Sequence, residues 1–295
     1  MDVKKAILFV NLQKKNSSVL ARQIEQELTK KNIQVTIFSF EGNPEELLLE
    51  KWDIAFSLGG DGTILYAART LAGTGTPIMP VNLGTLGFIA SVKKDKWLDV
   101  FELWRRGEVN FSPRCMLDVS VEREAETVNK NTCLNDAVIS TAGIAKLIKL
   151  KVHICIAPGK YSELGFYRCD GLIVATPTGS TGYSLSAGGP ILDPEMEAMI
   201  LNPICPFTLF NRPLVFPSSM ALTVTVAEDQ RSGVLLTIDG QDTFTLECKD
   251  RIIIQQAPSH AKLISVDRNT YYSALRSKLS WFGDVVSGSN GDAHA

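Results

Sequence analysis

Short apolar runs alternate with amphipathic segments through the first hundred residues of the chain. The segments between the runs place apolar side chains three and four positions apart. This alternation is typical of βαβ units, in which parallel strands are joined by crossover helices. We therefore expect an α/β domain with a parallel sheet over residues 1–113, with strands at residues 6–10, 34–40, 52–58 and 78–81 and helices near residues 19–28, 44–49, 63–72 and 95–106.

A different periodicity follows Gly107. Leu117, Val119 and Val121 alternate with polar residues, and this alternation indicates strands with one buried face. We expect residues 114–266 to form a second, all-β domain of stacked sheets, similar to a β-sandwich.

A helical pattern returns near the end of the chain. Residues 267–283 place Tyr272, Leu275 and Leu279 on one side, and we expect this segment to pack back on the first domain. Residues 284–295 are rich in Gly, Ser and Asn, and we expect them to be disordered.

The composition excludes several classes of function. Thirty Lys and Arg against 32 Asp and Glu give a net charge of −2, so the chain has no overall basic field for nucleic-acid binding. The six cysteines form no C-x-x-C pair and only three histidines accompany them, which argues against a zinc site and favours reduced thiols in a cytoplasmic protein. The apolar run at residues 6–10 is too short for a signal peptide, and the uncharged run at residues 171–192 holds too many Gly, Pro, Ser and Thr for a membrane helix.

The sequence Ser57-Leu-Gly-Gly-Asp-Gly-Thr63 stands where an apolar strand passes into a helix. Consecutive glycines at the end of a parallel strand let backbone N–H groups approach a phosphate, and the helix N-terminus that follows favours negative charge. This segment therefore predicts a phosphate-binding loop.

Asp61 is an unusual residue inside such a loop. A carboxylate repels phosphate unless it holds a metal ion or takes a proton from a nucleophile. The alternative is structural, with Asp61 acting only as the N-cap of the helix.

A second glycine turn, Val81-Asn-Leu-Gly-Thr-Leu-Gly-Phe88, follows the next strand. Because parallel strands end at the same edge of a sheet, we expect the two loops to lie side by side and to form one wall of a crevice. Gly84 and Gly87 are equally compatible with ordinary turns. The chain has no G-x-G-x-x-G after its first strand, no G-x-x-x-x-G-K-[ST] and no G-x-S-x-G, so dinucleotide dehydrogenases, P-loop NTPases and α/β-hydrolases lose their main support.

Two polar segments stand out in the β-rich half. Asn135 and Asp136 interrupt an apolar strand and can pair with the two hydroxyls of a ribose, although an Asx turn is the structural alternative. Residues 168–171 precede a strand, and the Gly-, Ser- and Thr-rich block at residues 176–190 follows it. This block predicts a hydrogen-bonding loop in which Tyr183 can stack on a base.

Taken in order, these motifs resemble those of the NAD kinase family. The resemblance extends from about residue 6 to residue 281 and includes the ending Leu275-Arg-Ser-Lys-Leu279. The first glycine motif is shared with 6-phosphofructokinases and with diacylglycerol and sphingosine kinases. The block at residues 176–190 is much more specific to NAD kinases.

The resemblance implies that ATP phosphorylates the 2′-hydroxyl of the adenosine ribose of NAD to give NADP, with a divalent cation that we expect to be Mg²⁺. Asp61 would be the general base, and the metal ligands are not identified. The family's dimers and tetramers, formed through the β domain, imply a homo-oligomer. The implied substrate-binding residues are Gly60, Asp61, Gly62, Phe88, Asn135, Asp136, Lys146, Arg168, Asp170, Thr181, Gly182, Tyr183, Ser184, Leu185, Ser186 and Gln241.

Two positions depart from the family pattern. Gly182 stands where the family commonly has Ala, which should cost little, and Phe207 replaces a common His, which puts a polar contact there in doubt. A lipid or sugar kinase with the same first motif is one alternative, but it leaves residues 176–190 unexplained. A non-catalytic NAD-sensing module is another, but a pure binder has no need for Asp61 among phosphates.

Overall fold

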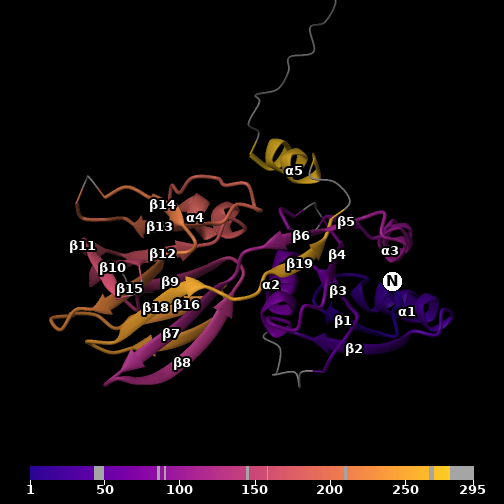
Figure 1. Cartoon of the computed structure of the whole chain (residues 1–295), viewed down its shortest axis with the longest axis horizontal. Helices are drawn as coiled ribbons and strands as arrows, with labels where there is room; N and C mark the ends of the chain where they lie inside the picture. Colours follow the sequence, from indigo (N-terminus) through magenta and orange to yellow (C-terminus); the bar gives the residue numbers. More distant parts are fainter. Residues whose placement is uncertain are drawn as a thin grey trace, which may run out of the picture.

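The computed structural model describes residues 1–42, 50–84, 87–89, 91–143, 146–157, 159–208, 211–265 and 269–279, the side chains of residues 269 and 270 excepted. The helix expected at residues 44–49 and the tail expected at residues 284–295 lie outside the described residues. Figure 1 shows two lobes, one with helices around a sheet and the other built of strands. The predicted combination of an α/β domain with an all-β domain is confirmed.

The first lobe contains the predicted parallel sheet. Its strands run in the order β2-β1-β3-β4-β19-β6, with β5 paired to β4, and all pairs are parallel except β19 with β6. The strands are β1 (Lys5–Asn11), β2 (Gln34–Phe40), β3 (Ile54–Gly59), β4 (Ile78–Asn82), β5 (Val92–Lys93), β6 (Phe111–Arg114) and β19 (Ala261–Ile264).

Helices cover both faces of this sheet. Successive residues of β1 point to opposite faces, so Leu8 packs in one core and Phe9 in the other. The core around Leu8 contains residues of α1 (Ser17–Thr29) and α3 (Trp97–Arg106), whereas the core around Phe9 contains residues of α2 (Asp61–Thr70). A sheet buried on both faces explains why its strands are continuous apolar runs.

The second lobe is a β-sandwich with one shared core. One antiparallel sheet has the order β11-β10-β15-β18-β7-β8 and the other the order β14-β13-β12-β9-β16-β17. Alternating residues such as Val119 and Leu172 point from the two sheets into this core. The strands are β7 (Leu117–Arg123), β8 (Glu126–Cys133), β9 (Asp136–Thr141), β10 (Ile148–Ala157), β11 (Lys160–Cys169), β12 (Gly171–Ala175), β13 (Ala198–Ile204), β14 (Leu214–Pro217), β15 (Ala221–Val226), β16 (Val234–Ile238), β17 (Asp242–Leu246) and β18 (Arg251–Gln256).

The chain returns to the first sheet earlier than its sequence indicated. Strand β19 lies within the range 114–266 expected for the second domain, yet it is inserted between β4 and β6, with Ala261 opposite Arg114. A strand of four residues carries too little periodicity to reveal its partners in the sequence.

Helix α5 (Asn269–Leu279) follows β19 and lies above the junction of the two lobes (Figure 1). Tyr271, Ala274 and Leu275 form its buried side, whereas Tyr272 is exposed. Tyr272 was expected on the apolar side of this helix, but the preceding residue, Tyr271, occupies that side. The hydroxyl of Tyr272 instead donates to Asp193 at 2.7 Å. Among the described helices, none combines the length and apolar character needed to cross a membrane.

Candidate active site

The first glycine loop places Asp61 at the start of α2. Gly60 occupies the N-cap position in an extended conformation, so the structural alternative that made Asp61 the N-cap is wrong. The carboxylate of Asp61 accepts hydrogen bonds from the backbone N–H groups of Phe88 at 3.3 Å and Ile89 at 3.4 Å. The second glycine loop therefore holds this carboxylate in place.

The two glycine loops lie side by side, as predicted. Gly59 pairs with Asn82 in the parallel register of β3 and β4, so both strands end at the same edge. A Cβ on Gly87 would stand 2.1 Å from Oδ1 of Asp61, closer than any side chain can approach. Glycine at this position is what allows the loop to close on the carboxylate.

A cavity of about 260 Å³ opens at this edge of the sheet. Asp61, Gly60 and residues of the second glycine loop line it, together with three lysines that were not predicted to bind substrate. These cations come from the β1–α1 connection and from α5, so no local motif connects them with the glycine loops. The cavity is lined by Lys14, Lys15, Gly59, Gly60, Asp61, Asn82, Leu83, Gly84, Gly87 and Lys278.

The second polar cluster is built around Asn135 and Asp136. The carboxylate of Asp239 accepts hydrogen bonds from the backbone N–H groups of Leu134 at 3.0 Å, Asn135 at 2.7 Å and Asp136 at 3.1 Å. Asp239 has a φ of 51° in the turn after β16. A carboxylate distant in the sequence therefore holds the backbone of residues 134–136 in place. In the described part of the chain, the side-chain Oδ1 atom of Asn135 is buried without a hydrogen-bond partner.

The carboxyl groups of this cluster are deprived of solvent. Burial, and then the charge of Asp239, raises the pKa of Asp136 to about 7. Burial also raises the pKa of Asp239, although its three backbone donors and Arg69 oppose the shift. Asp136 can thus donate or accept a hydrogen bond near neutral pH.

The block at residues 176–190 folds against Asn135. The backbone N–H of Thr176 donates to the Asn135 carbonyl at 2.8 Å, and a Cβ on Gly179 would stand only 2.1 Å from the same oxygen. At Gly182 a Cβ would stand 3.4 Å from Nδ2 of Asn135 and 3.8 Å from Oδ2 of Asp136. Gly182 therefore adjoins both polar side chains, and the alanine that the family commonly has here would place its Cβ 3.2 Å from the carbonyl oxygen of Gly179, which would have to shift slightly.

Several hydroxyl groups of this block serve the fold itself. Ser180 bonds to the carbonyl of Pro177 and accepts from the N–H of Leu192, and buried Ser184 accepts from Nδ2 of Asn202 through its carbonyl and hydroxyl oxygens. In α4 (Tyr183–Ser186), by contrast, Tyr183 is 50% exposed. Ser186 is also exposed, and Thr181, Gly182 and Leu185 are half-buried.

The two polar clusters are connected across the domain junction. Arg69 of α2 donates to the side chain of Gln241 at 3.0 Å and lies 2.7 Å from a carboxylate oxygen of Asp242 and 3.9 Å from one of Asp239. Gln241 in turn donates to the carbonyl of Gly62 at 2.8 Å. The predicted residue Gln241 therefore joins the loop of Asp61 to the turn that organises Asn135.

The remaining predicted residues lie elsewhere on the β domain. Arg168 is exposed and stacks on Phe207, with its guanidinium carbon 4.7 Å from the ring centroid. Phe207, which replaces a histidine common in the family, therefore contacts Arg168 through the face of its ring, as aromatic rings do with cations. Asp170 is half-buried between β11 and β12, and Lys146 is exposed beside Gly143.

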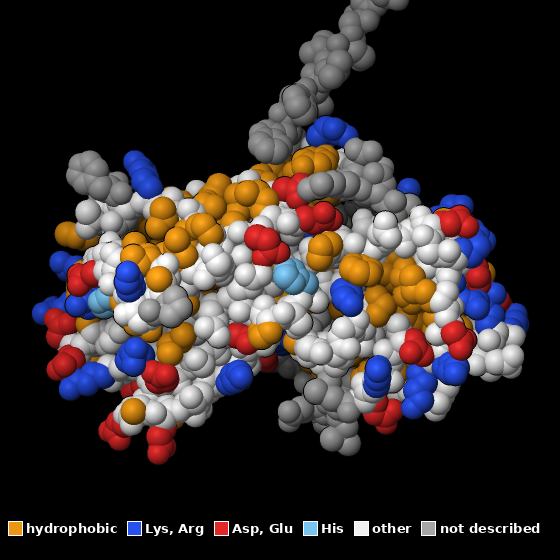
Figure 2. Space-filling model, in the orientation of Figure 1, with side chains coloured by type: hydrophobic (Ala, Val, Ile, Leu, Met, Phe, Trp, Pro, Cys, Tyr) orange, Lys and Arg blue, Asp and Glu red, His pale blue; other side chains and the backbone are white. Residues whose placement is uncertain are grey.

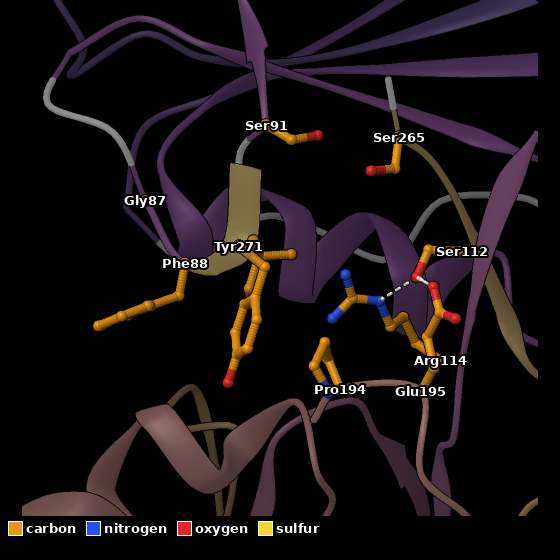
Figure 3. A pocket seen from close by; sticks show the side chains of 10 residues that line it. Gly87, Phe88, Ser91, Ser112, Arg114, Pro194, Glu195, Ser265 and Tyr271 are labelled. Atoms are coloured by element: carbon orange, nitrogen blue, oxygen red, sulfur yellow. Dashed lines mark hydrogen bonds between the residues drawn. The ribbon is translucent and has the colours of Figure 1, made fainter. Parts of the chain in front are cut away.

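A smaller cavity, of about 20 Å³, lies behind the Gly87–Ile89 loop. Figure 3 shows the guanidinium of Arg114 beside it, with Nε donating to Ser112 at 3.0 Å and the Ser112 hydroxyl bonded to Glu195 at 2.5 Å. Burial lowers the pKa of Arg114 to about 10, so it stays charged at neutral pH. This pair of bonds connects β6 to the segment that follows α4 at the back of the site.

Two family profiles match the chain. Residues 44–109 match the ATP-NAD kinase N-terminal domain, and residues 134–266 match the ATP-NAD kinase C-terminal domain.

Individual proteins are also similar over most of their length. The NAD kinase of Treponema denticola is 39% identical over 284 residues, which cover 95% of this chain and 98% of that protein. The NAD kinase of Geobacter sulfurreducens is 41% identical over 229 residues, 78% of each chain.

Two solved structures have the same fold. Yeast NADH kinase complexed with NADH superposes with a TM-score of 0.84 at 22% identity, covering 98% of this chain and 91% of that one. An NAD kinase from Archaeoglobus fulgidus in complex with ATP gives a TM-score of 0.70 at 26% identity, covering 95% of this chain and all of the other.

Proposed function

The chain belongs to the NAD kinase family and uses ATP to phosphorylate the adenosine 2′-hydroxyl of NAD, and on this premise we propose how its residues divide the reaction. Asp61 is the general base. The observation that carries this role is its position: the carboxylate lines the cavity at the glycine loop and is held by the N–H groups of Phe88 and Ile89. A base held in this way loses little freedom when the substrate arrives.

In the proposed reaction Asp61 accepts the proton of the 2′-hydroxyl of NAD. At the same time the 2′-oxygen bonds to the γ-phosphorus of ATP, and the bond between that phosphorus and the leaving ADP breaks. Phosphoryl transfer requires mainly alignment and charge stabilisation. The open backbone at Gly60 gives the phosphates access to the N-terminus of α2, where N–H groups favour negative charge.

The β domain is proposed to hold NAD. The unpartnered Oδ1 of Asn135 supports a ligand contact at this position, because a buried polar atom normally has a partner. Asp136 binds a hydroxyl of the same ribose as Asn135, and the exposed ring of Tyr183 stacks on a base. The proposed NAD site is completed by Gly62, Phe88, Lys146, Arg168, Asp170, Thr181, Gly182, Ser184, Leu185, Ser186 and Gln241.

A divalent cation is proposed to accompany ATP. Asn82 gives the cavity a side-chain oxygen, which Mg²⁺ prefers, and would hold the ion together with the phosphates, because Asp61 serves as the base. The described residues include no group of three or more His, Cys, Asp or Glu suited to a metal, so the phosphates would supply most of its ligands. When bound, the ion neutralises phosphate charge.

Homo-oligomerisation is proposed to occur through the β domain. Figure 2 shows hydrophobic side chains gathered on this lobe, and patches of this kind mark interfaces. The exposed large apolar residues of this lobe include Ile156, Tyr161, Phe166, Phe207, Leu214 and Val215.

A cytoplasmic location is proposed from the cysteines, all six of which are described and free.

The experiment compares acceptors under one assay. We expect NADP formation from NAD with ATP and Mg²⁺, and no turnover of diacylglycerol or fructose 6-phosphate. An NAD analogue that lacks only the 2′-hydroxyl should inhibit competitively without being phosphorylated, with affinity lowered about 5- to 150-fold. Phosphate transfer to this analogue would show that Asp61 does not act at the 2′-position.

A further inference from the structure

Three lysines from distant parts of the sequence meet around the cavity that contains Asp61. Lys14 and Lys15 lie between β1 and α1, and Lys278 lies in the last turn of α5. Lys14 reaches over the glycine loop, with its Nζ 4.0 Å and its Cε 3.8 Å from the place where a Cβ on Gly60 would stand. The ammonium group therefore faces the open backbone of the loop.

Lys278 reaches the same cavity from α5, near the other end of the chain. Its Nζ lies 4.5 Å from the ring centroid of Phe88, whose N–H group holds the carboxylate of Asp61. This cation–π contact fixes an exposed lysine beside the second glycine loop. The C-terminal helix thus brings a positive charge to the place where the two loops meet.

The charges of the cavity do not balance. Three ammonium groups and the single carboxylate of Asp61 line it, which leaves two positive charges among the described lining residues. Within the described part of the chain, none of the three lysines forms an ion pair. Like charges gathered without counter-ions repel each other, and a bound anion removes that cost.

The cavity is small for a complete nucleotide. Its volume of about 260 Å³ is below the roughly 300 to 1,000 Å³ of pockets that enclose a whole ligand. The uncapped N-terminus of α2 opens on the same space at Gly60 and adds favourable N–H dipoles. An extended polyphosphate chain fits these features better than a compact, neutral group does.

We propose that Lys14 and Lys278 bind the polyphosphate of a nucleotide substrate, with Lys15 contributing to the field. This inference rests on the proposed function. The shared chemistry is a phosphoanhydride, which both ATP and NAD contain, and the experiment below separates these two sources. Lys278 also gives α5 a role in substrate binding that packing alone does not explain.

The test compares charge removal with charge conservation. Lys14→Gln and Lys278→Gln are assayed beside Lys14→Arg and Lys278→Arg, and Arg276→Gln serves as the matched control because it removes a charge from the same helix outside the cavity. For each protein, kcat and the KM values for ATP and NAD are measured with the other substrate saturating. Thermal unfolding checks that all variants are folded.

We expect each Gln variant to raise the KM for one nucleotide by about 10- to 100-fold, the size of a lost charge-assisted hydrogen bond. The Arg variants should recover most of that loss, and Arg276→Gln should match the wild type. A selective rise for ATP assigns the lysines to the donor triphosphate, and a selective rise for NAD assigns them to the acceptor diphosphate. KM values for both nucleotides within twofold of wild type would overturn the proposal.

The affinities of the same variants for ATP and for NAD, measured by calorimetry, test the lysines without depending on whether NADP is formed. If wild-type protein bound the nucleotides but formed no NADP, the proposed function would fail while the lysines could still be tested. Unchanged affinity of both Gln variants for both nucleotides would refute the inference even if the wild type formed NADP.

Discussion

The side-chain amide of Gln241 donates a hydrogen bond of 2.8 Å to the carbonyl oxygen of Gly62, the residue after the proposed base Asp61. Gln241 also accepts from Arg69, which lies near the other end of α2. The turn that carries Gln241 also carries Asp239, whose carboxylate holds the backbone of Asn135. One turn of the β domain therefore sets the distance between the proposed base and the proposed ribose site.

Loss of Arg69 should destabilise this junction. Arg69→Met leaves the fully buried carboxylate of Asp239 without its cation, and breaking a partly buried pair of this kind should lower the free energy of unfolding by about 3 kcal/mol. Urea denaturation monitored by fluorescence measures the change. Arg69→Lys keeps the charge and should lose less. Equal stability of Arg69→Met and wild type would mean that the backbone donors alone stabilise Asp239.

Asp61→Asn should separate catalysis from binding. The amide has nearly the same shape but cannot accept the 2′-hydroxyl proton, so kcat should fall on the order of 10² to 10⁴-fold. The affinity for NAD, measured by calorimetry, should change little. Asp99→Asn on the exposed side of α3 provides a control with the same chemical change. Turnover of Asp61→Asn close to that of wild type would eliminate the general-base role.

Two glycine substitutions should have different effects. In Gly60→Ala the new Cβ meets nothing closer than Lys14 at 3.8 Å, so the protein should fold normally while turnover falls on the order of 10²-fold, because the methyl group displaces the phosphates. In Gly87→Ala the Cβ would overlap the carboxylate of Asp61, so both stability and turnover should fall, stability by about 1 to 3 kcal/mol.

Melting temperature and initial rate, measured together, distinguish the two glycine variants. If Gly60→Ala also lost cooperative unfolding, Gly60 would be a structural glycine and the phosphate-binding loop would lose its main support.

The pH dependence of stability should reveal Asp136. Its pKa is raised from 3.8 to about 7 in the folded protein, so folding favours the protonated form. The stability that this proton contributes is fully present below about pH 4 and is lost as the pH rises through 7. Asp136→Asn cannot ionise, so its stability relative to wild type should rise between pH 5 and pH 8, by up to a few kcal/mol.

Urea denaturation at pH 5, 6, 7 and 8 measures this difference. Glu126→Gln, on an exposed strand, should run parallel to wild type over the same range. A constant difference between Asp136→Asn and wild type would show that Asp136 keeps an ordinary carboxyl pKa.

The sequence located the parts of the site that are local. Asp61 and the two glycine loops follow neighbouring parallel strands, so their meeting at one sheet edge was predictable. The position of Asn135 beside Gly179 was not, because it depends on the antiparallel pairing of β9 with β12. The family resemblance supplied these residues, whereas their spacing alone did not connect them.

Other contributions depend on long-range contacts that leave no local pattern. Lys14 and Lys278 come from opposite ends of the sequence, and only the folded chain brings them to one cavity, Lys14 beside Gly60 and Lys278 beside Phe88. Asp239 stands in a turn, where an acidic residue usually caps the local backbone, yet it serves residues more than a hundred positions earlier. The hydroxyl of Ser180 and the carbonyl of Ser184 accept hydrogen bonds from Leu192 and Asn202, and no periodicity in the block at residues 176–190 indicates these internal partners.

The pairing of Arg114 with Ala261 gives the molecule the connectivity of an inserted cassette. The chain leaves the first sheet at β6 and rejoins it at the adjacent strand β19, so the segment that carries the β-sandwich begins and ends at one pair of neighbouring residues. Its entry and exit points are thus opposite each other in one antiparallel strand pair. Residues 115–260 therefore form an insertion between two paired strands, and an exchange of this segment between relatives would have to preserve the contacts of Gln241 with Arg69 and Gly62 across the junction.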